Sequence, residues 1–379
     1  MGCMSAGALP AHSLGSAFDR TRNGLNIVRL GLALVVLLDH SLVLSGTADL
    51  QFHGVNPGLV AVFGFFGLSG FLLVGSASRQ SPATYLRRRF ARIFPAFWIV
   101  LVITAFVIVP AALLVADSWC GGSCYLSGQD GAVSYVWRNA ALWIAQPGIA
   151  GTPDGIPVSG NWNGSLWTLV FEFLCYLGLL VLAAGGIIRK FERLAAVWLI
   201  AVLVGAVFTL VPVLRAEFTT FAHPFLTPPL YLVPVFLTGA VIGRGMGRLP
   251  DSGVVAASCL IVYVLALMVP IEAPAGVFGL SAGTLLAPLV VYPVVWVGCR
   301  LTLWQGLRRN DVSYGVYIYA FPVQQALLVV GVLKAGYPVY LAATLVLVAL
   351  LAVGSWVLVE RPAIRWGARP SRSQTHAAA

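Results

Sequence analysis

Residues 26–45 read NIVRLGLALVVLLDHSLVLS, an apolar run interrupted only near its two ends, by Arg29 and by the pair Asp39 and His40. A helix rises 1.5 Å per residue, so about 20 residues cross the roughly 30 Å hydrocarbon core of a bilayer. We therefore predict an all-α, polytopic membrane protein with about ten transmembrane helices. The nine further runs lie at roughly 58–78, 93–115, 165–188, 195–214, 229–247, 254–270, 277–299, 314–333 and 339–360.

The composition excludes the usual soluble classes. Of the 379 residues, 59% are hydrophobic and 9% are charged, whereas an ordinary soluble domain has about 25% charged residues. A water-soluble core could not bury so much apolar surface, and a disordered chain would contain far less of it. The few charged side chains must then mark either orientation or function.

Most of the charge is explained by orientation. Lysine and arginine stay on the cytosolic side of membrane spans, and with the N-terminus inside, 19 of the 23 fall on that side. We predict cytosolic termini and no nucleic-acid partner, although the net charge is +10. The expected organisation is a cytosolic tail at 1–25, a transmembrane domain at 26–362 with an outer loop at 116–164, and a second cytosolic tail at 363–379.

The outer loop contains Cys120 and Cys124 within WCGGSC. In an oxidising space outside the cytosol they could form a local disulfide, and free thiols are the alternative. The histidines on that side, His53 and His223, lack the paired spacing of zinc ligands. We therefore predict no metal site.

Ionisable side chains inside the membrane are functional candidates because their burial is costly. Arg29 and His40 are eleven residues apart, which places them on one helix face about 16 Å apart along the axis. A snorkelling arginine and a histidine hydrogen-bonded within the bundle are the structural alternatives. Glu172, in the run 165–188, has a similar predicted depth to His40 and could polarise it. The alternative is that Glu172 bonds to Tyr176 or Trp167, while Asp39 faces either the loop or the same cavity.

Arginines also cluster at the cytosolic boundary, where Arg88, Arg89 and Arg92 precede the third run. Lipid headgroup contact explains such a cluster, and a phosphate clamp is the sharper alternative, since guanidinium groups match phosphate oxygens. Ser69 lies among glycines near mid-membrane, where close helix packing is the ordinary explanation. Glu360 adjoins Arg361, and we expect the two to form a structural ion pair.

Taken in order, these segments resemble the membrane acyltransferase-3 family, whose members move acyl groups, often acetyl, onto sugars. The resemblance covers about residues 24–366. The matching segments are Arg29 and His40 with ten residues between them, FFGLSGFLL (65–73), RRFARIFP (88–95), SLWTLVFEFLCYL (165–177), SYGVYIYAFPV (313–323) and Glu360-Arg361-Pro362.

The resemblance implies a mechanism. An acyl-CoA, such as acetyl-CoA, enters from the cytosol as co-substrate, and no cofactor is bound permanently. Its phosphates meet Arg88, Arg89 and Arg92, with Arg29 deeper and Ser69 on the same acyl-CoA path. His40 acts as general base on a saccharide or glycoside hydroxyl, with Glu172 orienting it. A transient acyl-histidine is the alternative chemistry.

The resemblance also implies a multi-pass protein of the bacterial inner (plasma) membrane, in contact with membrane lipid. Many relatives carry a further soluble domain, whereas this chain stops soon after Glu360, so a stand-alone enzyme, a homo-oligomer or a separate extracytoplasmic partner is expected. A secondary transporter or flippase of a lipid-linked or small anionic solute is the alternative function. Transporters often contain two related halves, and the sequence shows none.

Overall fold

The computed structural model describes residues 13–19, 21–52, 55–210, 212–269, 283–301 and 310–369, and for 209–226 it describes no side chains. The regular structure of these residues is helical, and the predicted all-α fold is confirmed. Six helical segments of the described chain are long and apolar enough to cross a membrane. They are Leu25–Leu44, Pro57–Ala77, Pro82–Val115, Gly164–Ala184, Phe191–Phe208 and Tyr337–Ala368.

The count of ten spans and the cytosolic termini stay predictions. Two further apolar helices, α11 (Gly253–Met268) and α13 (Ala287–Arg300), are shorter than those six. The other elements are α1 (Leu14–Ala17), α2 (Leu25–Leu44), α3 (Pro57–Ala77), α4 (Pro82–Ile103), η1 (Thr104–Ile108), α5 (Val109–Val115), α6 (Gly122–Ser127), α7 (Ala132–Asn139), η2 (Gly164–Leu166), α8 (Trp167–Ala184), η3 (Ile187–Arg189), α9 (Phe191–Leu210), α10 (Pro212–Gly245), α15 (Ser313–Val329), η4 (Val332–Ala335), α16 (Tyr337–Ser355), η5 (Trp356–Glu360) and α17 (Arg361–Ala368).

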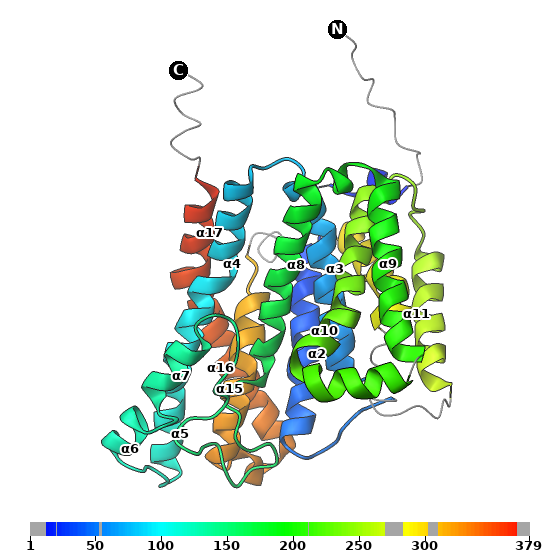
Figure 1. The fold of residues 1–379 in the computed structure, drawn as a ribbon. Helices are drawn as coiled ribbons and strands as arrows, with labels where there is room; N and C mark the ends of the chain where they lie inside the picture. Colours follow the sequence, from blue (N-terminus) through cyan, green and yellow to red (C-terminus); the bar gives the residue numbers. More distant parts are fainter. Residues whose placement is uncertain are drawn as a thin grey trace, which may run out of the picture.

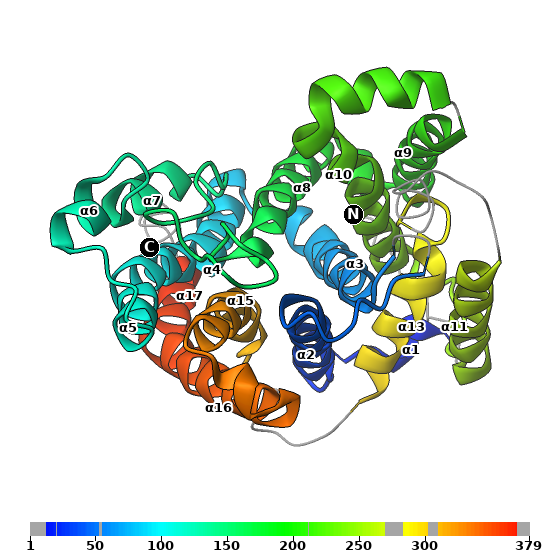
Figure 2. The same ribbon diagram turned by 90° about the horizontal axis from the view of Figure 1, so that it is seen from below.

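Helix α3 lies inside the bundle, in contact with α2, α8, α10 and α13 (Figures 1 and 2). Glycines allow its backbone to approach α10 closely. A Cβ atom on Gly70 would lie 1.9 Å from the carbonyl oxygen of Phe236, and one on Gly239 would lie 1.8 Å from that of Gly67. Small residues permit such approaches between membrane helices. The packing interpretation of the glycines around Ser69 is therefore confirmed.

The third membrane segment begins earlier than the sequence predicts. Helix α4 starts at Pro82, not near residue 93, because Ser81 caps it by accepting a hydrogen bond from the Thr84 N–H, and proline suits the first helical turn. The helix continues through the π-helical η1 into α5. The arginine cluster is consequently part of this helix and not of a preceding loop.

The C-terminal segment also extends further as helix. The predicted last run ends at residue 360, but η5 and α17 continue it to Ala368, and α17 packs along α4 (Figure 1). Arg87 of α4 donates a hydrogen bond from Nε to the Gly367 carbonyl oxygen at 3.1 Å and bonds to that of Arg369. The predicted tail 363–379 therefore begins in a docked helix.

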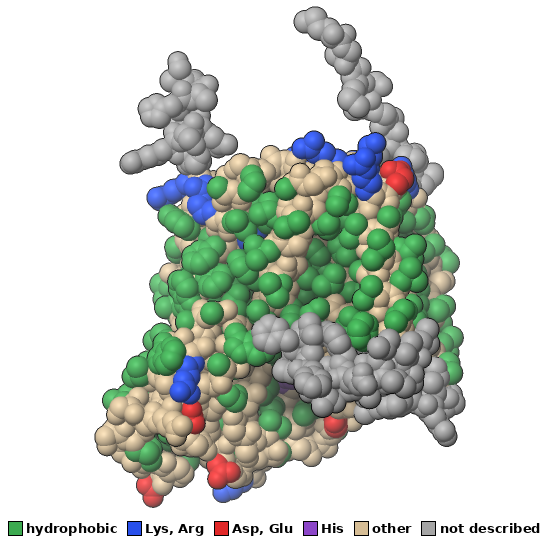
Figure 3. All heavy atoms as spheres, viewed as in Figure 1, with side chains coloured by type: hydrophobic (Ala, Val, Ile, Leu, Met, Phe, Trp, Pro, Cys, Tyr) green, Lys and Arg blue, Asp and Glu red, His purple; other side chains and the backbone are tan. Residues whose placement is uncertain are grey.

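Charged side chains are divided between the two ends of the bundle. Figure 3 shows most of the visible lysines and arginines at the end that carries the α8–α9 connection, and most visible carboxylates at the other. The predicted outer loop, 116–164, lies at the second end and contains α6 and α7 (Figure 1). This separation agrees with the charge pattern on which the orientation prediction rests.

Candidate active site

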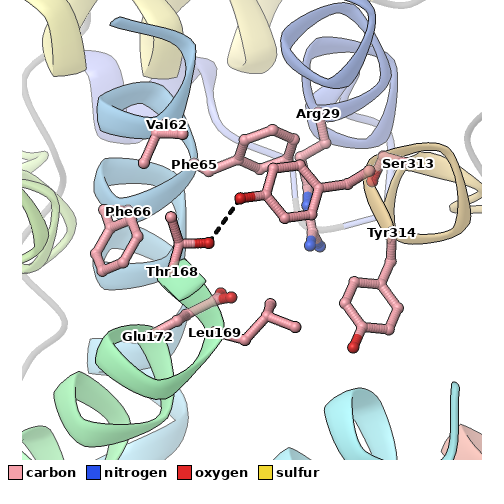
Figure 4. A pocket seen from close by; sticks show the side chains of 10 residues that line it. Arg29, Val62, Phe65, Phe66, Thr168, Leu169, Glu172, Ser313 and Tyr314 are labelled. Carbon is pink, nitrogen blue, oxygen red and sulfur yellow. Dashed lines mark hydrogen bonds between the residues drawn. The ribbon is translucent and has the colours of Figure 1, made fainter. Parts of the chain in front are cut away.

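A pocket lies between α2, α3, α8 and α15. Figure 4 shows the guanidinium of Arg29 directed into the space that Thr168, Glu172 and Tyr314 frame. The pocket thus combines a cation, a carboxylate and hydroxyl groups at membrane depth. Its lining residues are Arg29, Val62, Phe65, Phe66, Thr168, Leu169, Glu172, Ser313, Tyr314 and Tyr317.

Glu172 is held by two hydroxyl groups. Its Oε1 accepts a hydrogen bond from Ser69 Oγ of α3 at 2.9 Å and another from the hydroxyl of Tyr176, one turn further along α8. The structural alternative of a bond to Tyr176 is therefore confirmed. Neither hydrogen bond involves His40, so the role of Glu172 in orienting His40 stays a prediction. Glu172 instead shares its pocket with Arg29.

Polar groups continue from the pocket along one side of α15. The hydroxyl groups of Thr168 and Tyr317 are 2.6 Å apart, and Tyr317 also donates to the carbonyl oxygen of Ser165 at 2.8 Å (Figure 4). Beyond them, Asn163 Nδ2 donates to the carbonyl oxygen of Ile318 at 2.9 Å. Aromatic and polar side chains therefore join the pocket to the segment that precedes α8.

His40 lies on the same helix as Arg29, three turns further along. Its ring packs edge-on against Phe321 of α15, with ring centroids 5.3 Å apart. Its Nδ1 atom is buried and has no hydrogen-bond partner among the described residues. The structural alternative of a histidine hydrogen-bonded within the bundle therefore finds no support at Nδ1. The neighbouring Asp39 points elsewhere, toward the start of α3 at Gly58.

Asp311 is the main site residue that sequence reasoning missed. Its Oδ2 accepts from Arg29 Nη1 at 2.9 Å and from Arg92 Nη2 at 2.5 Å. Its Oδ1 accepts from the hydroxyl of Ser313 at 2.5 Å and from the Ser313 N–H at 3.3 Å. An aspartate two residues before a serine that opens a helix is a recognisable turn signal. No sequence signal, however, pairs it with arginines 282 and 219 residues away.

Arg92 is also close to Glu360, whose side chain is 1% exposed. The distance from Arg92 Nη1 to Glu360 Oε2 is 3.9 Å, and Glu360 Oε1 accepts from Ser355 Oγ at 3.1 Å. The expected pair between Glu360 and Arg361 is therefore wrong. Adjacent residues on a helix point about 100° apart, and the π-helical η5 ends at Glu360 as the chain passes α4.

Arg88 and Arg89 differ from Arg92 because neither has an ion-pair partner among the described residues. Their Nε atoms are buried without an acceptor. The Arg89 guanidinium carbon lies 5.9 Å from the ring centroid of Tyr176. Tyr176 thus contacts both Arg89 and Glu172, and it joins the arginine cluster to the pocket.

The outer-loop cysteines are exposed and not joined by a disulfide in the structure. A side-chain hydrogen bond with Cys124 raises the pKa of the Cys120 thiol. The two thiols are therefore neighbours, and the disulfide stays a prediction. Within the described ranges no group of three or more histidine, cysteine and acidic side chains could hold a metal ion. His53 and the side chain of His223 lie outside the described part of the chain.

The family model described as an acyltransferase domain matches residues 22–359. The chain belongs to the acyltransferase-3 family. The segment that the family model matches includes every residue that lines the pocket, and it also includes Asp311. No solved structure matches the chain significantly.

Three relatives agree with this membership. The chain is 28% identical to an "O-acetyl transferase" of Shigella phage Sf6, over 89% of this chain and 95% of the relative. It is 26% identical to "Nodulation protein 10" of Rhizobium leguminosarum bv. viciae, over 91% of this chain and 94% of the relative. It is also 30% identical to "Acyltransferase MdmB" of Streptomyces mycarofaciens, over 55% of this chain and 50% of the relative. The membership and these relatives support a membrane O-acyltransferase.

Proposed function

We propose that this acyltransferase moves an acyl group, acetyl in the first instance, from cytosolic acyl-CoA to a hydroxyl of a saccharide or glycoside. Membership of the family supports acyl transfer, and the printed name of the phage relative supports acetyl as the acyl group. The predicted location is the bacterial inner membrane. The donor, the acceptor class and the role of His40 are the proposed parts of this function.

The observation that carries the proposal is the unpartnered Nδ1 of His40. Buried polar atoms in proteins are nearly always hydrogen-bonded, so an exception calls for an explanation. A general base must have a free nitrogen within reach of the hydroxyl that it deprotonates. His40 Nδ1 is buried against α15 and has no partner in the part of the chain that the structure describes, which suits a nitrogen that bonds to a substrate hydroxyl.

The arginines on α4 suit the donor end of the reaction. No carboxylate of the described residues pairs with Arg88 or Arg89, and guanidinium groups bind phosphate oxygens in forked pairs. The pocket beside them provides Arg29 and Glu172 as polar groups for an amide-containing arm. Arg29 and His40 are about 16 Å apart along α2, so an extended pantetheine arm would bring the thioester from the arginines toward His40.

The chemical step then needs only the two substrates and His40. The acceptor oxygen attacks the thioester carbonyl carbon, and His40 takes the hydroxyl proton. The carbon–sulfur bond breaks as the ester forms, and the protonated imidazole returns the proton to the departing CoA thiolate. Glu172 and Arg29 stay in the donor pocket in this scheme and do not contact His40.

The test is transfer by the purified protein in detergent. We expect acetyl-CoA to release free CoA thiol only when an acceptor saccharide is present, with radiolabelled acetyl recovered on that saccharide. Acetyl-phosphopantetheine compared with acetyl-CoA would show whether the nucleotide is recognised. Uptake of a labelled solute into vesicles with no acetyl transfer to any acceptor would contradict the proposal and favour a transporter.

A further inference from the structure

Asp311 is a carboxylate at the centre of a charge network that joins three helices. Its Oδ2 contacts Arg29 of α2 and Arg92 of α4, while both contacts of its Oδ1 come from Ser313, the first residue of α15. The Asp311 side chain is 8% exposed. Because every contact is directional, the start of α15 fixes the orientation of the Asp311 carboxylate. The carboxylate in turn fixes the positions of the two guanidinium groups.

The network contains as many acidic as basic side chains. It contains two guanidinium groups, Arg29 and Arg92, and two carboxylates, Asp311 and Glu360. Buried charges are tolerated when they are paired and hydrogen-bonded, and the loss of one member leaves its partner uncompensated. A phosphate that approached Arg92 would have to displace Asp311 or Glu360. The neighbouring Arg88 and Arg89 impose no such cost, because neither has an ion-pair partner in the described chain.

We propose that Asp311 is a positioning residue for acyl transfer, which holds Arg29 in the pocket and removes Arg92 from donor binding. Donor phosphates are then bound by Arg88 and Arg89, and Arg92 serves as the second cation of the Asp311 network. This inference rests on the proposed function and corrects the expectation that all three arginines of α4 bind acyl-CoA. It assigns to Asp311 a role in orienting Arg29, which does contact the donor in the scheme above.

The experiment separates positioning from phosphate binding. The variants are Asp311→Asn, Asp311→Glu and Arg88→Gln, with Arg248→Gln as the control, since Arg248 forms an exposed pair with Glu192 far from the pocket lining. The measurements are kcat and KM with acetyl-CoA and with acetyl-pantetheine, a donor that lacks phosphate. We expect Asp311→Asn to lower kcat by about tenfold or more with both donors, because misplacement by about 1 Å can cost on the order of 100-fold.

The two kinds of variant should differ in KM. Asp311→Asn should leave the KM for acetyl-CoA within about threefold of wild type, and Asp311→Glu should restore part of kcat. Arg88→Gln should raise the KM for acetyl-CoA about tenfold, the loss of one charge-assisted bond, and leave that for acetyl-pantetheine unchanged. An Asp311→Asn enzyme with normal kcat, or one altered only in the KM for acetyl-CoA, would overturn the proposal.

A second measurement needs no turnover. Thermal unfolding in detergent of Asp311→Asn, Arg92→Gln and the double variant measures their coupling. We expect the double variant to be no less stable than Asp311→Asn alone, because the two changes remove a paired charge together. Strictly additive losses would overturn the network. If the wild type transferred no acetyl group, the proposed function would fail, and this coupling would still decide whether Asp311 pairs with Arg92.

Discussion

Ser69 of α3 donates a hydrogen bond to Glu172 of α8, with 2.9 Å between Ser69 Oγ and Glu172 Oε1. The bond joins the glycine-rich helix at the centre of the bundle to the carboxylate of the candidate active-site pocket. Figure 4 shows the carboxylate of Glu172 beside Thr168 and facing the same space as Arg29. The position of Ser69 in an otherwise apolar helix is thereby explained, because its hydroxyl serves the pocket carboxylate.

The first prediction concerns this hydrogen bond. Ser69→Ala removes one of the two donors to Glu172 and should reduce kcat by about tenfold, the equivalent of a hydrogen bond to a charged group worth about 1.5 kcal/mol. Ser69→Thr keeps a hydroxyl and is the matched control. Steady-state kinetics with acetyl-CoA provide the measurement. Equal rates for Ser69→Ala and wild type would show that the bond has no part in turnover.

The second prediction concerns the contact between α3 and α10. Gly70→Ala should destabilise the protein by about 1–3 kcal/mol or more, the usual cost of overpacking, because the new Cβ would lie 1.9 Å from a backbone oxygen of α10. Gly31→Ala in α2 is the control, since nothing beyond its chain neighbours and the backbone of its own helix lies within 4 Å of the corresponding Cβ position. Thermal unfolding in detergent measures both variants. If Gly70→Ala were as stable as Gly31→Ala, this packing would be refuted.

These two cases show what the sequence could and could not predict. Runs of about 20 apolar residues predict membrane helices well, because the bilayer thickness sets their length. The sequence did not predict the start of α4 or the end of α17, because polar residues continue each of these helices beyond its apolar run. The small residues around Ser69 could be assigned to packing, since glycines in a membrane helix have that common use.

The sequence indicates which charged residues belong to the site, but it does not indicate which of them pair with one another. Arg29, Glu172 and the arginines of α4 stand out as ionisable groups at or near membrane spans. Their partners do not, because Asp311 is 282 residues from Arg29 and its own segment carries no membrane signal. The pairing of Glu360 with Arg361 failed for the opposite reason, since residues adjacent in sequence point apart on a helix.

The third prediction concerns the outer-loop cysteines. In protein prepared from cells without reductant, an alkylating reagent should modify neither Cys120 nor Cys124, and both should react after reduction, as expected for a disulfide in an oxidising compartment. In the reduced protein the raised pKa of Cys120 leaves less thiolate at neutral pH, so its alkylation should accelerate as the pH rises above 7. Peptide mass analysis measures each site. Alkylation of both cysteines before any reduction would refute the disulfide.

The fourth prediction concerns orientation. After reduction, Cys120 should react in intact cells with a reagent that cannot cross the inner membrane, because the predicted topology places the loop 116–164 on the side away from the cytosol. A cysteine introduced by Ser252→Cys, beside Asp251 at the predicted cytosolic end, should react only after the cells are made permeable. The reverse pattern would invert the predicted topology and place the arginines of α4 outside the cytosol.

The central claim is that the free nitrogen of His40 is the base for acyl transfer. The direct measurement is acceptor-dependent release of CoA thiol from acetyl-CoA by purified His40→Ala, compared with wild type and with Leu38→Ala, whose side chain is 42% exposed on the same helix. General-base catalysis contributes about 10²–10⁴-fold, so His40→Ala should lose at least about 100-fold in kcat while Leu38→Ala stays near wild type. Normal acceptor-dependent turnover by folded His40→Ala would contradict the account.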